Sequence, residues 1–287
     1  MMRLGIHCDP TAFKLAASVG FREWTMWDFN SQGFRAPYPF EPTPNTWVHP
    51  TTNIANAIAA GLNPIGVLHL DSNSPRFPNL ATTLANPGPV KNPDGTTPPI
   101  TVLNPWQWYA RVAVWSNPSV QMWRIWNEPS GSAWHLPQDV YVEAVKQASE
   151  IIHAYKGLVI AGAGDLFDSA YDWHFTDVYS RLVPYADMLS MDYGHGSDIR
   201  YINRAKSLKR FGLPVWNVEY SPKVAANTAP TKEQWSDALA MHEESGVDFV
   251  SIYYMRCDQD GLGNMWDVAN KCFKPWALPI LERATRQ

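Results

Sequence analysis

The chain has 287 residues, of which 45% are hydrophobic and 17% charged, and its 23 basic and 27 acidic side chains give a formal net charge of −4. Disorder is excluded, because 13% aromatic residues and a low charge favour a packed interior. A nucleic-acid partner needs a basic surface, which this chain lacks. No apolar run approaches the roughly 18 residues of a membrane span. We therefore expect a folded chain with neither nucleic acid nor membrane as a partner.

The N-terminal apolar run Leu4-Gly5-Ile6 is far too short for the core of a signal peptide. The compartment therefore stays open: the protein is intracellular, leaves by another route, or acts outside the cell after removal of a leader. Three cysteines do not make a disulfide framework. Cys257 and Cys272 could bridge a short loop, or remain buried free thiols.

Short β-rich runs alternate with helical patterns along the whole chain. The runs typical of strands are Leu4–His7, Phe21–Trp27, Ile65–Leu70, Val120–Trp126, Leu158–Ala163, Met188–Asp192, Pro214–Glu219 and Phe249–Met255. Helical patterns follow them between Asp9 and Gly20, over Thr52–Ala60, from Pro105, from Pro137 to Gly157, over Phe175–Leu182, over Ile199–Phe211, from the capping box Thr231-x-x-Gln234 to Gly246, and over Pro275–Arg283.

Eight βα units in one chain of this length predict an α/β fold, a single (β/α)8 TIM barrel over residues 1–287. A doubly wound open sheet is the alternative, but the first strand is followed by Asp9-Pro10 and not by a Gly-rich phosphate turn. The two longest irregular stretches, residues 28–51 and 71–104, both follow strands. We therefore expect long βα loops on the C-terminal face, where barrel enzymes build their active sites.

Two of the predicted strands end in glutamate, one as Trp126-Asn127-Glu128 and the other as Val218-Glu219. Glycoside hydrolysis uses two carboxyl groups, one to protonate the leaving oxygen and one to attack the anomeric carbon. The fourth and seventh strands face one another across a barrel, so the two side chains could converge to the roughly 5–5.5 Å of a retaining mechanism. A lone strand-end glutamate more often pairs with arginine, but the pair, with Asn127 beside it, favours catalysis.

The segments Tyr109–Arg111 and Val120–Pro129 resemble the acid/base region of clan A glycoside hydrolases, most of all families 39 and 5. The resemblance implies a (β/α)8 retaining enzyme that acts mainly on β-linked sugars and needs no cofactor. It also implies Glu128 as general acid/base, Glu219 as nucleophile and Asn127 as the donor to the sugar 2-hydroxyl.

The resemblance has departures on two later strands. In those families strand six commonly carries a His followed two residues later by Tyr, whereas this chain has Tyr193 and then His195. We expect Tyr193 to hydrogen-bond the nucleophile and His195 to bind a substrate hydroxyl, with packing as the alternative for both. Strand eight of the relatives often presents a Trp floor, and Tyr253 stands nearest that position.

Fourteen tryptophans are a high count for this length. The C–H face of a pyranose ring stacks on indole, and its hydroxyls are left for a polar rim. We place three tryptophans in a sugar-binding cleft: Trp27, at the end of the second strand, and Trp134 and Trp266, which follow the fourth and eighth strands. Asp28 and His69 are the polar contacts expected beside them, and ordinary packing is the alternative for each. Four tryptophans in helical patterns are expected in the core between helices and barrel: Trp106, Trp108, Trp115 and Trp235.

Two other classes of function remain open. The first is a metal-dependent barrel hydrolase, because His7-x-Asp9 and His69-x-Asp71 end the first and third strands and carry residue types that bind Zn²⁺ or Mn²⁺. Glu128, Asp192 and His195 would complete such a site. The second is a sugar-binding barrel without activity. We expect instead a monomeric retaining glycosidase with a carbohydrate substrate, no metal and no cofactor.

Overall fold

The computed structural model describes residues 2–26, 51–69, 88–89, 102–127, 129–130, 136–162, 175–192, 199–222, 229–255, 264–267 and 269–286. Six of the residues predicted for the site lie outside this part of the chain: Trp27, Asp28, Glu128, Trp134, Tyr193 and His195. The same is true of Asp71 and of most of the two long loops. The predicted roles of these residues stay predictions.

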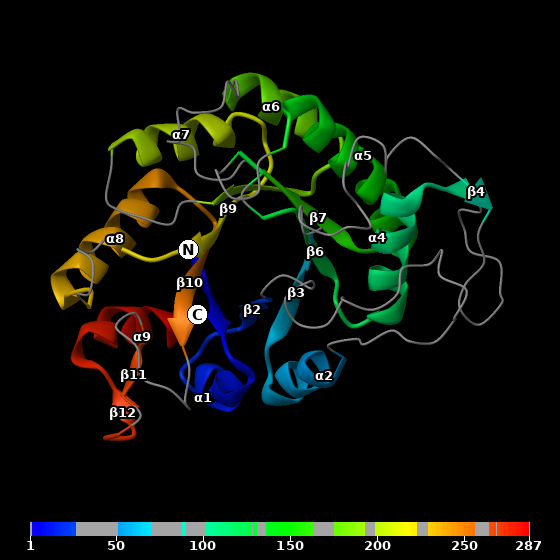
Figure 1. Cartoon of the computed structure of the whole chain (residues 1–287). Coiled ribbons are helices and arrows are strands. Elements are labelled where there is room, and N and C mark those ends of the chain that lie inside the picture. Colours follow the sequence, from blue (N-terminus) through cyan, green and yellow to red (C-terminus); the bar gives the residue numbers. More distant parts are fainter. Residues whose placement is uncertain are drawn as a thin grey trace. The chain divides into compact units, whose positions relative to one another are not determined.

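Eight parallel strands form a closed barrel in the order β1-β10-β9-β8-β7-β6-β3-β2, which confirms the predicted TIM barrel and excludes the open sheet (Figure 1). The barrel strands are β1 (Arg3–Cys8), β2 (Glu23–Thr25), β3 (Asn63–Leu68), β6 (Met122–Ile125), β7 (Leu158–Ala161), β8 (Met188–Asp192), β9 (Val215–Tyr220) and β10 (Phe249–Met255). Two short antiparallel pairs lie outside it: β4 (Gly88–Pro89) with β5 (Val102–Leu103), and β11 (Trp266–Asp267) with β12 (Cys272–Phe273).

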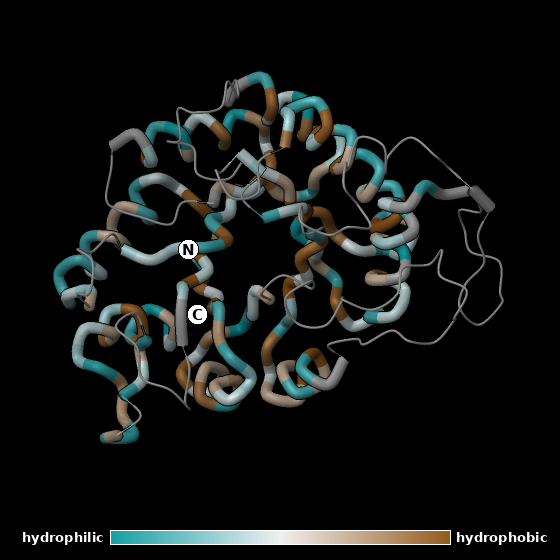
Figure 2. Tube along the Cα trace, viewed as in Figure 1, coloured by the Kyte–Doolittle hydropathy of each residue, from teal (hydrophilic) through white to brown (hydrophobic). Residues whose placement is uncertain are grey.

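Helices alternate with these strands as predicted. In the described part of the chain they are η1 (Pro10–Ala12), α1 (Phe13–Ser18), α2 (Thr51–Ala60), α4 (Pro105–Ser116), α5 (Gln138–Ala154), α6 (Phe175–Leu182), α7 (Ile199–Lys209), α8 (Lys232–Ser245), η2 (Pro275–Ala277) and α9 (Leu278–Ala284). None of them is both long enough and apolar enough to cross a membrane. Hydrophobic and hydrophilic positions alternate along α5, whose apolar side is buried (Figure 2).

The chain divides into two compact units, and each is described by itself. The first unit comprises Met1–Met26, Asn53–Pro64 and Leu189–Gln287, and the second comprises Trp27–Thr52 and Ile65–Met188. The expectation of a single domain stays a prediction.

In the first unit, a layer of large side chains lies at the N-terminal ends of the strands. A Cβ on Gly5 would lie 2.3 Å from a ring carbon of Phe249, so glycine is what admits this ring. The Arg3 guanidinium lies over the rings of Trp216 (5.4 Å) and Phe249 (5.9 Å), and its Nη1 donates to Glu23 Oε1 at 2.8 Å. Burial raises the pKa of Glu23, although the charge of Arg3 acts in the opposite direction. These side chains lie at the ends of the strands that carry no chemistry in TIM-barrel enzymes.

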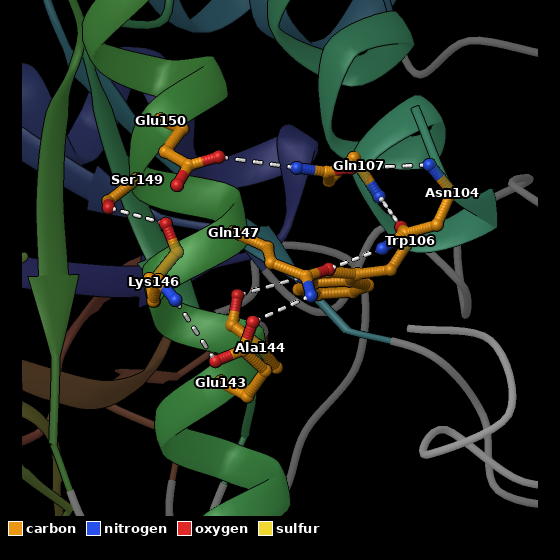
Figure 3. A network of polar contacts seen from close by, with 9 residues as sticks. All are labelled: Asn104, Trp106, Gln107, Glu143, Ala144, Lys146, Gln147, Ser149 and Glu150. Carbon is orange, nitrogen blue, oxygen red and sulfur yellow. Dashed lines mark hydrogen bonds and ion pairs between the residues drawn. The ribbon is translucent and has the colours of Figure 1, made fainter. Parts of the chain in front are cut away.

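In the second unit, polar side chains join the start of α4 to α5 (Figure 3). Asn104 and Gln107 form a capping box, in which Asn104 Oδ1 accepts from the Gln107 N–H at 2.9 Å. Asn104 Nδ2 also donates to Gln147 Oε1 at 2.6 Å, and Trp106 Nε1 donates to the Ala144 carbonyl at 2.8 Å. The first turn of α4, from which Trp106 enters the core, is therefore fixed against α5.

The burial of the helical tryptophans follows the prediction in part. Trp106 and Trp235 are fully buried, as expected for core residues, whereas Trp115 is half-buried. The side chain of Trp108 and the whole of Cys257 lie outside the described residues. Cys272 is a free thiol, which agrees with one of the two predicted alternatives. The thiol was expected to be buried, whereas it is exposed.

Candidate active site

Glu219 is the penultimate residue of β9, at the C-terminal end of a barrel strand, and its side chain is half-buried. The strand contains one more residue here than either of its neighbours. Asn217 and Tyr220, three positions apart in β9, pair with residues two positions apart in β10, and Asn217 and Glu219, two positions apart, pair with adjacent residues in β8. The pairs are Val250↔Asn217 and Ile252↔Tyr220 with β10, and Met191↔Asn217 and Asp192↔Glu219 with β8. Both registers therefore place a β-bulge at Val218–Glu219.

The bulge changes the direction of the Glu219 side chain. Asn217 Nδ2 lies 3.2 Å from His242 Nε2, and the ring of Tyr220 lies 4.3 Å from His242 and 5.9 Å from Trp235, both on α8. In a regular strand, residues three positions apart face opposite sides, yet Asn217 and Tyr220 both face α8. Because the extra residue resets the alternation before Tyr220, we infer that Glu219 lies on the face of the strand opposite α8.

Side chains hold the peptide group between Val218 and Glu219 at both ends. His7 Nε2 donates to the Val218 carbonyl at 2.7 Å, and the Glu219 N–H donates to Asn217 Oδ1 at 3.2 Å. His7 and Tyr253 are partners in the β1–β10 register, and their rings meet edge to face at 5.7 Å. The structure thus brings His7, Tyr253 and the bulge of β9 together in the first unit.

His242 supports this arrangement from α8. Its Nδ1 donates to the Ala238 carbonyl at 2.7 Å, so its Nε2 is the acceptor for the amide N–H of Asn217. Burial lowers the pKa of His242 to about 4, while the bond to Ala238 acts in the opposite direction. The imidazole is therefore neutral near pH 7. The sequence analysis did not single out Asn217 or His242, and a buried polar residue two positions before Glu219 was the only signal available.

In the second unit, the chain turns sharply between β6 and Asn127. Trp126 has φ = 68°, a left-handed conformation that costs a bulky residue about 1–3 kcal/mol. Its N–H donates to the Leu68 carbonyl at 2.7 Å, and its buried ring lies 4.6 Å from that of His69 and 6.0 Å from that of Trp106. Strain of this kind clusters at functional sites, and here it lies directly before Asn127.

Asn127 is half-buried, and its N–H donates to His69 Nδ1 at 3.3 Å. His69 is fully buried, and its carbonyl accepts from the Tyr109 hydroxyl at 3.1 Å. The observed contact of His69 is thus with the Asn127 backbone, and the expected contact with a sugar hydroxyl stays a prediction. Trp266 packs against Phe273 at 5.1 Å in the β11–β12 pair, and its stacking on a sugar also stays a prediction.

Two residues of the metal alternative have structural partners. Asp9 Oδ1 accepts from the N–H and the hydroxyl of Thr11 at 3.1 and 3.0 Å, which caps η1. His7 donates through Nε2 to the Val218 carbonyl. Within the described ranges, no group of three or more His, Cys, Asp or Glu side chains lies close enough to hold a metal ion.

No family profile and no curated protein matches the chain. Among solved structures, the hyperthermostable endo-1,4-β-D-mannanase of Thermotoga petrophila RKU-1 is 15% identical, with 100% of both chains covered and a TM-score of 0.62. An endo-β-1,4-glucanase from Xanthomonas axonopodis pv. citri is 11% identical, with 100% of both chains covered and a TM-score of 0.64. A GH39 β-xylosidase from Caulobacter crescentus is 14% identical over 97% of this chain and 70% of its own, with a TM-score of 0.63. The structural neighbours are thus clan A glycoside hydrolases, and the likeness shows that this chain shares their (β/α)8 barrel.

Proposed function

We propose that the chain is a retaining glycoside hydrolase that cleaves β-linked oligo- or polysaccharides, with Glu219 as nucleophile and Glu128 as general acid/base. The observation that carries the proposal is the bulge in β9. It adds one residue to a buried strand, and by the alternation of the strand this places Glu219 on the face opposite the one on which Asn217 contacts α8. Bulges are over-represented at the rims of barrels and next to active sites, where they re-aim side chains.

The proposed reaction is a double displacement. The Glu219 carboxylate attacks the anomeric carbon, the bond from that carbon to the leaving oxygen breaks, and Glu128 gives its proton to this oxygen. A glycosyl ester on Glu219 results. Glu128, now ionised, takes a proton from water as the water oxygen attacks the anomeric carbon, which releases the sugar and restores both carboxyl groups.

Asn127 and three tryptophans supply the sugar contacts in the proposal. Asn127 donates its amide to the 2-hydroxyl, and the strained turn at Trp126 together with the bond to His69 holds the Asn127 backbone for this contact. Trp27, Trp134 and Trp266 stack on sugar rings. The neighbours support a β-linked substrate, because the three described above are named as an endo-1,4-β-D-mannanase, a β-xylosidase and an endo-β-1,4-glucanase.

A reducing-sugar assay on a panel of β-mannan, β-glucan and xylan tests the proposal, with Glu219→Gln as the variant and Glu282→Gln, on the exposed side of α9, as matched control. We expect Glu219→Gln to lose at least about a thousandfold in kcat, because the nucleophile is removed, and to unfold at the wild-type temperature. An activated 2-deoxy-2-fluoro glycoside should label the peptide that contains Glu219, as read by mass spectrometry.

Three results would contradict the proposal. Activity retained in Glu219→Gln would remove the nucleophile. Loss of wild-type activity on incubation with a chelator would favour the metal-dependent hydrolase. Binding of a panel polysaccharide without release of reducing ends would favour the inactive sugar-binding barrel.

A further inference from the structure

The bulge in β9 leaves the direction of Glu219 to side chains of other elements. At a bulge the backbone ladder is interrupted, so the peptide group is free to tilt unless something else holds it. Here His7 of β1 binds the Val218 carbonyl at 2.7 Å, and Asn217 binds the Glu219 N–H at 3.2 Å. Since a tilt of this peptide moves the Cα–Cβ bond of Glu219, these two contacts bear directly on where the carboxylate points.

The hydrogen-bond network allows Asn217 only one orientation. His242 donates through Nδ1 to the Ala238 carbonyl at 2.7 Å, which leaves Nε2 as an acceptor. Asn217 must therefore turn its NH₂ toward His242, at 3.2 Å, and its Oδ1 toward the Glu219 N–H. Both side chains are buried, with 0% exposure for Asn217 and 1% for His242. Reversing the amide would therefore oppose its NH₂ to the Glu219 N–H and its Oδ1 to the lone pair of His242 Nε2, without water to relieve either.

We propose that His7, Asn217 and His242 are positioning residues that fix the direction of the Glu219 carboxylate, an inference that rests on the proposed role of Glu219 as nucleophile. None of the three needs to touch the sugar. Their effect is on chemistry and not on substrate binding, because an attacking oxygen displaced by about 1 Å costs about a hundredfold in rate.

The test compares Asn217→Leu with Val215→Ala. Leu has the same branched arrangement of side-chain heavy atoms as Asn, although its methyl groups are larger, and it cannot accept from the Glu219 N–H. Val215 is equally buried in β9 and its side chain has no polar atom. We expect Asn217→Leu to lower kcat about 10- to 100-fold with KM close to wild type, and to accelerate hydrogen exchange of the Glu219 amide. Val215→Ala should lower the stability and leave kcat, KM and the exchange of the Glu219 amide unchanged.

A second pair keeps the test decisive if Asn217→Leu does not fold. In His242→Gln the side-chain carbonyl can still accept from the Asn217 amide, whereas His242→Leu offers no acceptor. We expect His242→Leu to lose kcat as Asn217→Leu does, and His242→Gln to recover most of that loss.

The outcomes separate the two proposals. Wild-type kcat in Asn217→Leu, or in His242→Leu, while Glu219→Gln is inactive would overturn the positioning role and leave the nucleophile in place. If the hydrogen exchange of the Glu219 amide in Asn217→Leu equals that of the wild type, the positioning role is also overturned, whatever activity the protein has. Activity retained in Glu219→Gln would instead overturn the proposed function, and the positioning role with it.

Discussion

Acid should destabilise this protein through the buried imidazole of His242. The imidazole is buried, donates to the Ala238 carbonyl and accepts from Asn217, so the native structure holds it neutral, with its pKa lowered to about 4. In the unfolded chain the same group has its ordinary value of 6.5. The unfolded state therefore binds a proton first as the pH falls.

The size of the effect follows from these two values. Above pH 6.5 both states are neutral at His242 and the stability is at its full value. Between 6.5 and about 4 only the unfolded state is protonated, and below about 4 both are. The interval of about 2.5 pH units, at about 1.36 kcal/mol each, gives a loss of about 3 kcal/mol that accumulates as the pH falls through this window. The melting temperature should fall by roughly 6–10 °C.

The assay is unfolding by heat and by denaturant at several pH values from 7.5 to 4, for the wild type and for His242→Gln. Gln cannot titrate, so the difference between the two proteins isolates His242 from the other groups that titrate in this range. We expect the wild-type curve to fall by about 3 kcal/mol more than that of the variant. Parallel curves would refute the reasoning, because they would mean that His242 protonates equally in both states and that its Nε2 is not a fixed acceptor for Asn217.

Two further predictions concern stability alone. Gly5→Ala should destabilise by about 1–3 kcal/mol, because the added Cβ would lie 2.3 Å from the Phe249 ring; an unchanged melting temperature would mean that the ring moves freely. Asn104→Ala should cost about 1–2 kcal/mol, because it removes the cap on the Gln107 N–H and the bond to Gln147, and amides in the first turn of α4 should exchange faster than in the wild type; unaltered exchange there would contradict the capping role.

The elements that could be predicted from the sequence are those with local signals. The strands Met188–Asp192 and Phe249–Met255 have the predicted bounds, and the capping box of Thr231 and Gln234 is formed. Gly246 ends α8 in the left-handed conformation, with φ = 75°. Each of these features depends on neighbouring residues in the chain, which a sequence displays directly.

Errors arose where pairing between strands decides the outcome. The third strand begins at Asn63 and ends at Leu68, two residues before the predicted Ile65–Leu70. The strand includes Pro64, which the predicted bounds leave out; a proline is tolerated at the start of a strand, where its missing N–H costs no ladder bond. The left-handed Trp126 was also unexpected, because nothing local favours φ = 68° in a tryptophan.

The bulge at Val218–Glu219 shows why the candidate site could be only partly predicted. Glu219 was identified from its place at a strand end, yet simple alternation would put it on the same face as Asn217, which contacts α8. A barrel strand is buried on both faces, so its sequence carries no clean alternation from which a break could be read. Only the pairing of β9 with both neighbours reveals the extra residue. The role proposed for Glu219 therefore depends on contacts made by His7 and His242, which are more than twenty residues away from it in the chain.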